Sequence, residues 1–218
     1  MDRPSKYMRF PGVVAPPARL SREEEEKLSV RQRKLLDELE ELIVSEPVSG
    51  YTMAQIADCL NCSLRTLYAI AASKEGLLLI VADRRLRRIG GAALRKLEPD
   101  MSPLVALRTY LQATNEAVQP ESLLLQKNLS GVAGFLQNGM AHQNFLTAIV
   151  QHLLDRAVSE GQIEKIDTHA MAIILGSLGG YLGRPENAPL LQLSPKETAD
   201  AITDIIIRGM TVEKGKAR

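Results

Sequence analysis

The sequence predicts an all-α fold of about nine helices, and three observations support this. Apolar residues recur at helical spacing along most of the 218-residue chain, no segment keeps the two-residue period of a strand over a useful length, and capping residues precede the apolar stretches. Apolar residues make up 45% of the chain and aromatic residues 4%, so an aliphatic core of substantial size is expected. The length fits one large domain or two small ones.

Residues 1–20 are predicted to form a disordered basic arm. They contain four prolines and four Lys or Arg residues, a composition that favours an unstructured or extended chain. Order is expected to begin at Ser21, because Ser21 and Glu24 form a capping box in which each side chain bonds the other residue's backbone N–H. Leucines at helical spacing then predict one helix that continues to Pro47.

Two short helices follow. Thr52 and Gln55 form a second capping box, which predicts a helix over about 53–60. Asn61 ends this helix, and Ser63 caps the next, which reaches about residue 70.

Serine, aspartate and proline mark the starts of the remaining helices. Ser or Asp is a strong N-cap, and proline is favoured at the first helical position because its missing N–H has no partner there. Gly90-Gly91 is the expected point of a bend or frayed turn. The expected helices are 73–97, 103–118, one from 120 whose end is left open by three glycines, 141–159, 167–183 and 195–209.

The two short helices satisfy the requirements of a helix-turn-helix. The first helix needs a small residue where the second crosses it, both need apolar anchors, and the turn needs a residue that tolerates the left-handed conformation. Asparagine is the non-glycine residue that adopts that conformation most readily. The residues in these roles are Ala57 at the crossing, Asn61 at the turn, and Ile56, Leu60, Cys62, Leu67 and Ile70 facing inward. The alternative is an unrelated helix pair.

Residues 48–85 resemble the DNA-binding region of the TetR family of transcriptional regulators. The matching residues are Thr52, Ile56-Ala57, Ser63, Leu67-Tyr68 and Ser73-Lys74. Two positions depart from the family pattern, with Asn61 where glycine is usual at the turn and Ala71 where an aromatic residue is usual. The resemblance implies a helix-turn-helix DNA-binding domain over 21–72 and a helical effector-binding and dimerisation domain over 73–218.

The expected DNA contacts lie on and around the second short helix. Its first turn holds Ser63, Leu64, Arg65 and Thr66, the end that reaches base edges in the major groove. Arg65 is the expected base reader, because its planar fork matches the O6 and N7 acceptors of guanine. The resemblance assigns Tyr68 and Lys74 to phosphates, and Thr52 is a further phosphate candidate. The alternative for Tyr68 is a half-buried core position.

A second basic feature is the run Arg84, Arg85, Arg87 and Arg88. It is interpreted as a solvated helix face or as a source of long-range attraction to DNA. The surrounding residues 51–98 carry a net charge of +4, whereas residues 99–218 carry −2. Different partners are therefore expected for the two halves.

The C-terminal half is expected to form a homodimer and to bind a small-molecule effector. The dimer candidates are small or apolar residues on the last two helices: Gly176, Gly179, Gly180, Gly183, Ile202, Ile205, Ile206 and Met210. Packing within one chain is the alternative. Candidate effector contacts, implied by the resemblance, are Tyr110, Gln126, Phe135, His142, Phe145 and His152.

The function predicted from these features is that of a cytoplasmic transcription regulator, a repressor that leaves a palindromic operator when an effector binds. No enzyme activity, metal, cofactor or membrane segment is expected, since neither metal-ligand spacing nor a nucleophile with its base is present. Two alternatives are an architectural DNA-binding protein without an effector and a thiol redox protein that uses Cys59 and Cys62.

Overall fold

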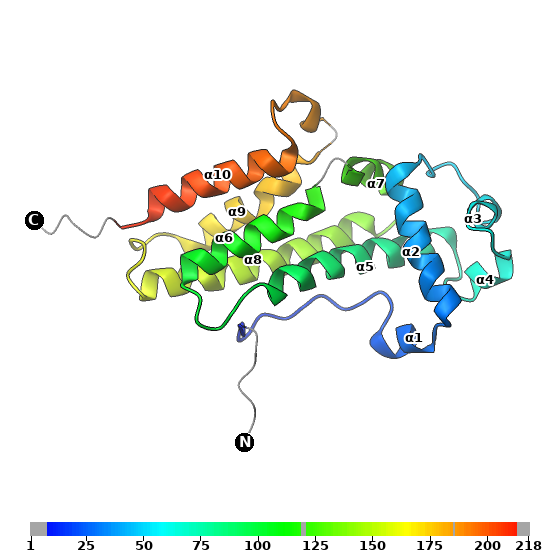
Figure 1. Cartoon of the computed structure of the whole chain (residues 1–218), viewed down its shortest axis with the longest axis horizontal. Coiled ribbons are helices and arrows are strands. Elements are labelled where there is room, and N and C mark those ends of the chain that lie inside the picture. The colour runs from blue at the N-terminus through cyan, green and yellow to red at the C-terminus, as the bar shows by residue number, and fades with distance from the viewer. Residues whose placement is uncertain (1–7, 119–120, 185, 213–218) are drawn as a thin grey trace, which may run out of the picture. The chain divides into compact units, whose positions relative to one another are not determined.

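The computed structural model describes residues 8–118, 121–184 and 186–212, and the regular elements of these residues are ten α-helices and two short 3₁₀-helices (Figure 1). In this part of the chain, one isolated β-bridge joins Ile163 to Thr211. The prediction of an all-α fold is confirmed. Among the described residues, no helix combines the length and apolar character needed to cross a membrane.

The chain divides into two compact units. The head, as we call it, comprises residues 16–88 and 120–142, and the body comprises 1–15, 89–119 and 143–218. Two helices continue from one unit into the other, α5 (Lys74–Arg95) and α8 (Phe135–Ser159). The head includes the predicted 21–72 together with the first part of α5 and a segment from the middle of the chain.

The head is built around α2 (Val30–Ser45). Packed with it are α1 (Arg22–Lys27), α3 (Met53–Cys59), α4 (Leu64–Tyr68) and α7 (Glu121–Leu129), and Figure 1 shows α7 beside α2. One hydrophobic cluster unites α2, α3, α4 and α7 with α5, whereas α1 contributes no buried residue to it. The fully buried members of the cluster include Leu35, Leu36, Leu39, Ile43, Ile56, Leu67, Leu77, Leu78 and Leu129.

The single helix predicted from Ser21 to Pro47 is wrong, because the structure has two helices there. Ser29 interrupts the pattern with a capping box of its own, in which its hydroxyl accepts from the Gln32 backbone N–H and the Gln32 side chain accepts from the Ser29 N–H. Leu28 adopts an extended conformation and ends α1. A strong N-cap thus outweighs the continuing leucine periodicity.

Other helix boundaries differ from the expected ones by a turn or more. The helix expected to begin near 141 starts at Phe135, so its early glycine is tolerated inside α8. The helix expected to end near 118 is α6 (Pro103–Thr114), and the 3₁₀-helix η1 (Asn115–Val118) follows it. Across Gly90-Gly91, α5 is continuous rather than interrupted. Packing of the flanking turns decides these cases, since glycine lowers helix propensity by only about 1 kcal/mol.

The prediction of a disordered arm does not hold for residues 8–20, and residues 1–7 lie outside the described part of the chain. In the body, the Met8 N–H donates to the Leu97 carbonyl at 3.2 Å. In the head, the Pro16 carbonyl accepts from Arg87 at 2.6 Å. The segment has no regular secondary structure, as its prolines require, but its backbone is held by each unit separately.

The basic run of α5 is solvated mainly at Arg88, whose side chain is 62% exposed, because the other three arginines are largely covered within the head. Each arginine is paired inside the head: Arg84 with Glu25 and Asp37 at 3.0 Å each, Arg85 with Glu40 at 2.9 Å, Arg87 with Asp83 at 2.7 Å, and Arg88 with Glu40. Apart from the Arg87–Asp83 pair, which lies within α5, these pairs join α5 to α1 and α2. The sequence interpretation missed them because the acidic partners lie 45 or more residues away, except for Asp83.

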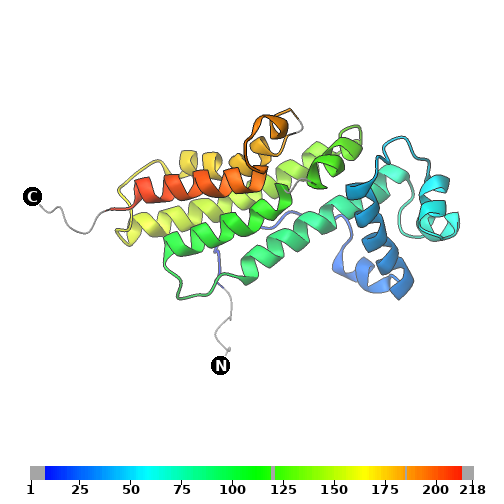
Figure 2. The same cartoon turned by 45° about the horizontal axis from the view of Figure 1, so that its top comes forward.

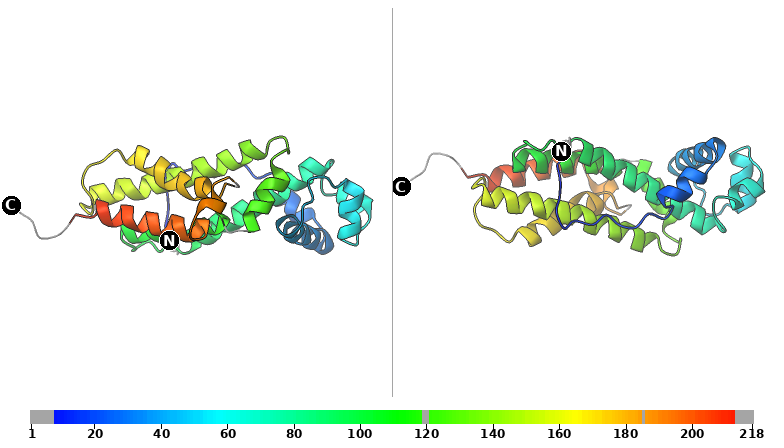
Figure 3. Two further views of the ribbon diagram at one scale, coloured as in Figure 1. Left: turned by 90° about the horizontal axis from the view of Figure 1, so that it is seen from above. Right: turned by 90° about the horizontal axis from the view of Figure 1, so that it is seen from below.

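The body packs α6, α9 (Thr168–Leu182) and α10 (Pro195–Met210) with the second part of α8, and the 3₁₀-helix η2 (Ala188–Leu190) lies between α9 and α10. Figures 2 and 3 show α10 alongside α9, and α10 also contacts α6. The buried core of the body is aliphatic apart from Tyr110, which is 1% exposed. The predicted caps Ser102, Asp167 and Ser194 all bond the first turns of their helices.

Three of the four glycines proposed for a dimer seam instead pack inside the chain. A Cβ added at Gly176 would lie 2.9 Å from Leu146, at Gly179 2.7 Å from the Asn115 side chain, and at Gly183 3.1 Å from Val118. All three are buried. The alternative of packing within one chain therefore applies to them, and only Gly180 is exposed with open space around it.

We expect Gly179→Ala to lower the free energy of unfolding by about 1–3 kcal/mol, because the new methyl group would overlap Asn115 in a packed interior. Gly90→Ala is the matched control, since a Cβ there meets nothing within 4 Å and removal of a helical glycine stabilises by about 0.5–1 kcal/mol. Urea unfolding of both variants measures the difference. Equal stability of the two would contradict the packing described for Gly179.

Candidate nucleic-acid interface

The turn between α3 and α4 is set by Asn61. Its φ of 47° makes it the one non-glycine residue in the left-handed region among the described residues. The Cys62 N–H donates to the Ala57 carbonyl at 3.0 Å, and the Asn61 N–H donates to the Asp58 carbonyl at 3.1 Å. These two bonds form a Schellman motif, the usual way of ending a helix with a left-handed residue. The prediction that Asn61 defines the turn is confirmed.

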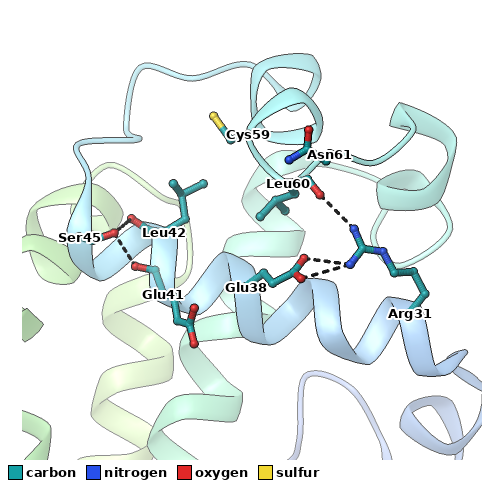
Figure 4. A pocket seen from close by; sticks show the side chains of 8 residues that line it. All are labelled: Arg31, Glu38, Glu41, Leu42, Ser45, Cys59, Leu60 and Asn61. Carbon is teal, nitrogen blue, oxygen red and sulfur yellow. Dashed lines mark hydrogen bonds and ion pairs between the residues drawn. The ribbon is translucent and has the colours of Figure 1, made fainter.

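Arg31 of α2 is hydrogen-bonded to the backbone at this turn. Its guanidinium donates to the Leu60 carbonyl at 3.1 Å and to both carboxylate oxygens of Glu38 at 3.2 Å (Figure 4). An orphan carbonyl at the end of α3 is thereby satisfied. A shallow cavity of about 340 Å³ lies beside the turn, lined by Arg31, Glu38, Glu41, Leu42, Ser45, Cys59, Leu60 and Asn61.

Helix α4 has one buried face and one exposed face. Leu67 is buried in the head core together with Ile56 and Ala57, as the motif requires. Leu64, Arg65 and Tyr68 are exposed. The exposed fraction of Tyr68 is 51%, so about half of this residue is covered, and its assignment to a phosphate stays a prediction. Among the described residues, the Arg65 guanidinium has no hydrogen-bond partner. The exposed face thus offers a guanidinium, a phenol and a leucine to a ligand.

Three of the polar candidates are already bonded within their own caps. The Ser63 hydroxyl accepts from the Thr66 N–H at 3.1 Å and lies 2.7 Å from the Thr66 hydroxyl. The Thr52 N–H and hydroxyl both donate to the Gln55 side chain, at 2.8 and 3.0 Å. A phosphate that approached Thr52 would compete with Gln55 for these protons.

Lys74 lies at the start of α5, with its ammonium on the loop before α3. It donates to the Ser49 carbonyl at 3.0 Å and to the Tyr51 carbonyl at 2.8 Å. An ammonium has three protons, so one remains for a phosphate. Lys74 therefore fixes the loop that precedes the motif, a role that the sequence did not reveal.

The two cysteines are free thiols in different surroundings. Cys59 is exposed in the last turn of α3, and Cys62 is half-buried against the head core. Burial raises the pKa of the Cys62 thiol, with Glu38 adding to the shift and Arg31 opposing it. A raised pKa lowers the thiolate fraction needed for disulfide exchange, which argues against the redox alternative. The described residues contain no group of three or more metal-ligating side chains.

The six predicted effector contacts are divided equally between the units. Tyr110, Phe145 and His152 belong to the body, and Gln126, Phe135 and His142 belong to the head. Tyr110 is buried, which raises the pKa of its phenol, and His152 stacks edge-on against Phe10 with ring centroids 5.4 Å apart. The roles of these residues as ligand contacts stay predictions.

His142 has a structural partner that the sequence did not indicate. Its Nε2 lies 2.8 Å from a carboxylate oxygen of Asp83, which is 1% exposed on α5. The other oxygen of Asp83 accepts from the Arg19 N–H at 3.1 Å and from Arg87 at 2.7 Å. A lone acid in a basic run, at an apolar helix position, was the only sequence signal for this cluster.

The dimer candidates outside the glycines are placed unequally. Ile205 is 62% exposed on α10, Ile202 is half-buried, and Ile206 and Met210 pack partly against the body core. Helix α9 exposes large apolar side chains that the sequence analysis did not name: Ile173, Ile174 and Tyr181. The buried glycines of α9, at 176, 179 and 183, lie on its opposite, inward face.

The comparisons with known proteins concern the fold. No family model matches the sequence, and no curated protein matches it. Solved structures do match. A regulatory protein of the TetR family from Rhodococcus RHA1 is 17% identical, with a TM-score of 0.65 over 86% of this chain and 100% of that chain. A TetR transcription regulator from Haloarcula marismortui is 15% identical, with a TM-score of 0.70 over 85% and 100%.

A third neighbour is a ketosteroid transcriptional regulator of Mycobacterium tuberculosis, 17% identical, with a TM-score of 0.57 over 86% of this chain and 98% of that chain. All three comparisons span nearly the whole length of the neighbour. The chain therefore has the fold of the TetR-family transcriptional regulators, as its sequence motif predicts.

Proposed function

We propose that the protein is a sequence-specific, DNA-binding transcription regulator that reads an operator with α4. The observation that carries the proposal is the exposed face of α4, where Arg65, Leu64 and Tyr68 stand free while Leu67 anchors the helix in the head core. Helix-turn-helix proteins place this second helix in the major groove, with its N-terminal residues at the base edges. The fold of the neighbouring regulators supports the same assignment.

The acting species in this proposal is a homodimer on a palindromic operator. The exposed apolar residues of α9 and α10 support it, because large exposed apolar patches mark interaction sites. A two-fold dimer presents two recognition helices to successive major grooves, about 34 Å apart. The proposed interface uses Gly180, Ile202 and Ile205 of the predicted set together with Ile173, Ile174 and Tyr181.

Regulation is proposed to be repression that a small-molecule effector relieves. Two helices, α5 and α8, pass without interruption from the body into the head, which gives a covalent route from one unit to the other. An effector changes operator affinity only if it binds two conformations of the protein unequally. The effector is proposed to bind in the body, near the candidate contacts Tyr110, Phe145 and His152.

Selection of bound sequences from random DNA at 100 and 200 mM salt tests the function. We expect a palindrome, and we expect Arg65→Ala to relax one base position in each half-site at a cost of about 1–3 kcal/mol. Lys74→Ala should weaken binding to all sequences about equally, because it releases the loop carbonyls of Ser49 and Tyr51 and removes a phosphate partner.

Lys165→Ala is the control, since it removes an exposed positive charge from the body, outside the head. It should leave both affinity and sequence preference unchanged. Weak binding without sequence preference, and with a steep salt dependence, would support the architectural alternative instead. Absence of any DNA binding by the unmodified protein would reject the proposed function.

A further inference from the structure

Asn128 of α7 is bonded entirely to the backbone of the DNA-reading half of the head. It is 3% exposed. Its amide nitrogen donates to the Ile43 carbonyl at 2.8 Å and to the Glu46 carbonyl at 2.7 Å, and its amide oxygen accepts from the Val48 N–H at 2.9 Å. Only this orientation of the amide pairs each donor with an acceptor, so the three partners fix the side chain.

The sequence explains why α2 needs such a partner. In a helix, the Ile43 carbonyl would accept from the N–H four residues later, but residue 47 is a proline and has no N–H. The Glu46 carbonyl lies beyond the end of α2, whose last residue is Ser45. The bond to the Ile43 carbonyl is buried and the bond to the Glu46 carbonyl is partly buried, so loss of the shared donor would be costly. Asn128 supplies the missing donor from a distant part of the chain.

Asn128 lies on the face of α7 that packs against α2. Leu125 and Leu129, three residues before and one residue after it, both belong to the head core. Positions 125, 128 and 129 share one side of a helix, so the amide is set between two apolar anchors. The segment is therefore a built part of the head rather than a surface attachment.

The connection between α2 and α3 is held at both ends by side chains from elsewhere. Asn128 donates to the Glu46 carbonyl and accepts from the Val48 N–H. Lys74 donates to the Ser49 and Tyr51 carbonyls. The next residue, Thr52, is the N-cap of α3. The conformation of residues 46–51 thus determines where α3 begins, and through the Asn61 turn where α4 lies.

We propose that Asn128 is a positioning residue for operator recognition, acting from α7 on the α2–α3 connection. The inference rests on the proposed function, since it assigns to α7 a part in presenting α4 to DNA. It also identifies α7 as the element of the head through which a movement in the middle of the chain would change the positions of α3 and α4. Asn128 itself does not touch the DNA.

The test compares Asn128→Asp and Asn128→Leu with Asn138→Leu in the full-length protein. Asn138 is a matched control, because it is 6% exposed in the same unit and its amide nitrogen has no partner among the described residues. Asn128→Asp keeps the acceptor for the Val48 N–H but sets a carboxylate against two carbonyls. Operator affinity is measured at a temperature at which circular dichroism shows every variant folded.

We expect both Asn128 variants to lose 10-fold or more in operator affinity, on the order of 1.4 kcal/mol, while Asn138→Leu stays within 2-fold of the unmodified protein. A merely structural role would change the melting temperature and leave the affinity of the folded fraction unchanged. Hydrogen exchange gives an independent readout, and the amides of residues 48–56 should exchange faster in the Asn128 variants than in Asn138→Leu.

The outcomes separate this inference from the proposed function. Unchanged operator affinity in folded Asn128→Asp, together with a loss in Arg65→Ala, overturns the positioning role and leaves the function standing. If the unmodified protein binds no DNA, the proposed function fails and the positioning role in operator recognition fails with it. Unchanged exchange of residues 48–56 in the Asn128 variants overturns the positioning role even if the protein binds DNA.

Discussion

Asp83→Asn is expected to lower the free energy of unfolding at pH 7 by about 3–5 kcal/mol, the usual cost of removing one partner from a buried charge cluster. The carboxylate is buried on α5 and receives three donors, from His142, Arg87 and the Arg19 N–H. Asparagine keeps the shape but loses the charge and sets an amide nitrogen against one of those donors. Urea unfolding monitored by circular dichroism measures the loss.

Asp100→Asn is the control for this variant, because it removes the same charge from an exposed loop residue, and it should change stability by no more than about 0.5 kcal/mol. Similar effects of the two substitutions would show that the Asp83 cluster contributes nothing beyond surface charge.

The stabilisation by Asp83 should also depend on pH. Burial alone would raise the pKa of Asp83, but the hydrogen bonds from His142, Arg87 and Arg19 outweigh it and hold the pKa below its ordinary value of 3.8. The unfolded chain therefore binds this proton at a higher pH than the native protein does. The contribution is complete above about pH 5 and is lost as the pH falls through the native pKa. The stability difference between the unmodified protein and Asp83→Asn should accordingly shrink between pH 5 and pH 3.

The double variant Ile174→Glu, Ile205→Glu is expected to be a folded monomer with an operator affinity lower by about 100-fold or more. Both side chains are more than half exposed in the single chain, so charge there leaves the body core intact but cannot be buried against a second copy. A monomer binds one half-site and loses the gain from simultaneous engagement of two. Light scattering measures the mass, and titration with operator DNA measures the affinity.

A matched double variant, Val105→Glu, Leu190→Glu, places the same charges at exposed apolar residues of the body outside α9 and α10. It should remain dimeric and keep its affinity. If the Ile174→Glu, Ile205→Glu variant also remains dimeric, the subunit interface lies elsewhere on the chain.

The sequence predicted the elements that are governed by neighbours in the chain. The capping boxes at Ser21, Thr52 and Ser194 and the left-handed Asn61 all depend on residues within a few positions, and the structure has them as expected. The break at Ser29 was missed because the leucine period continues across it, although its capping box is equally local. Local rules therefore describe this fold well where a cap and a periodicity agree.

Contacts between distant residues could not be predicted in the same way. The arginines of α5 were misread because only the folded head brings Glu25, Asp37 and Glu40 to them. The glycines of α9 were assigned to a partner because a small-residue stripe does not say which helix it meets. Of the expected DNA contacts, Lys74 was not predicted to bond the Ser49 and Tyr51 carbonyls, which lie more than 20 residues before it.

The bond between Val48 and Asn128 spans 80 residues of sequence, and this bears on how the protein is made. During synthesis, the helix-turn-helix leaves the ribosome well before α7 does, and domains generally fold as their parts emerge. Until Asn128 has been synthesised, the carbonyls of Ile43 and Glu46 at the end of α2 can bond only to water. The head consequently completes its folding only after residue 128 has left the ribosome, so α3 and α4 should not reach their final positions before then.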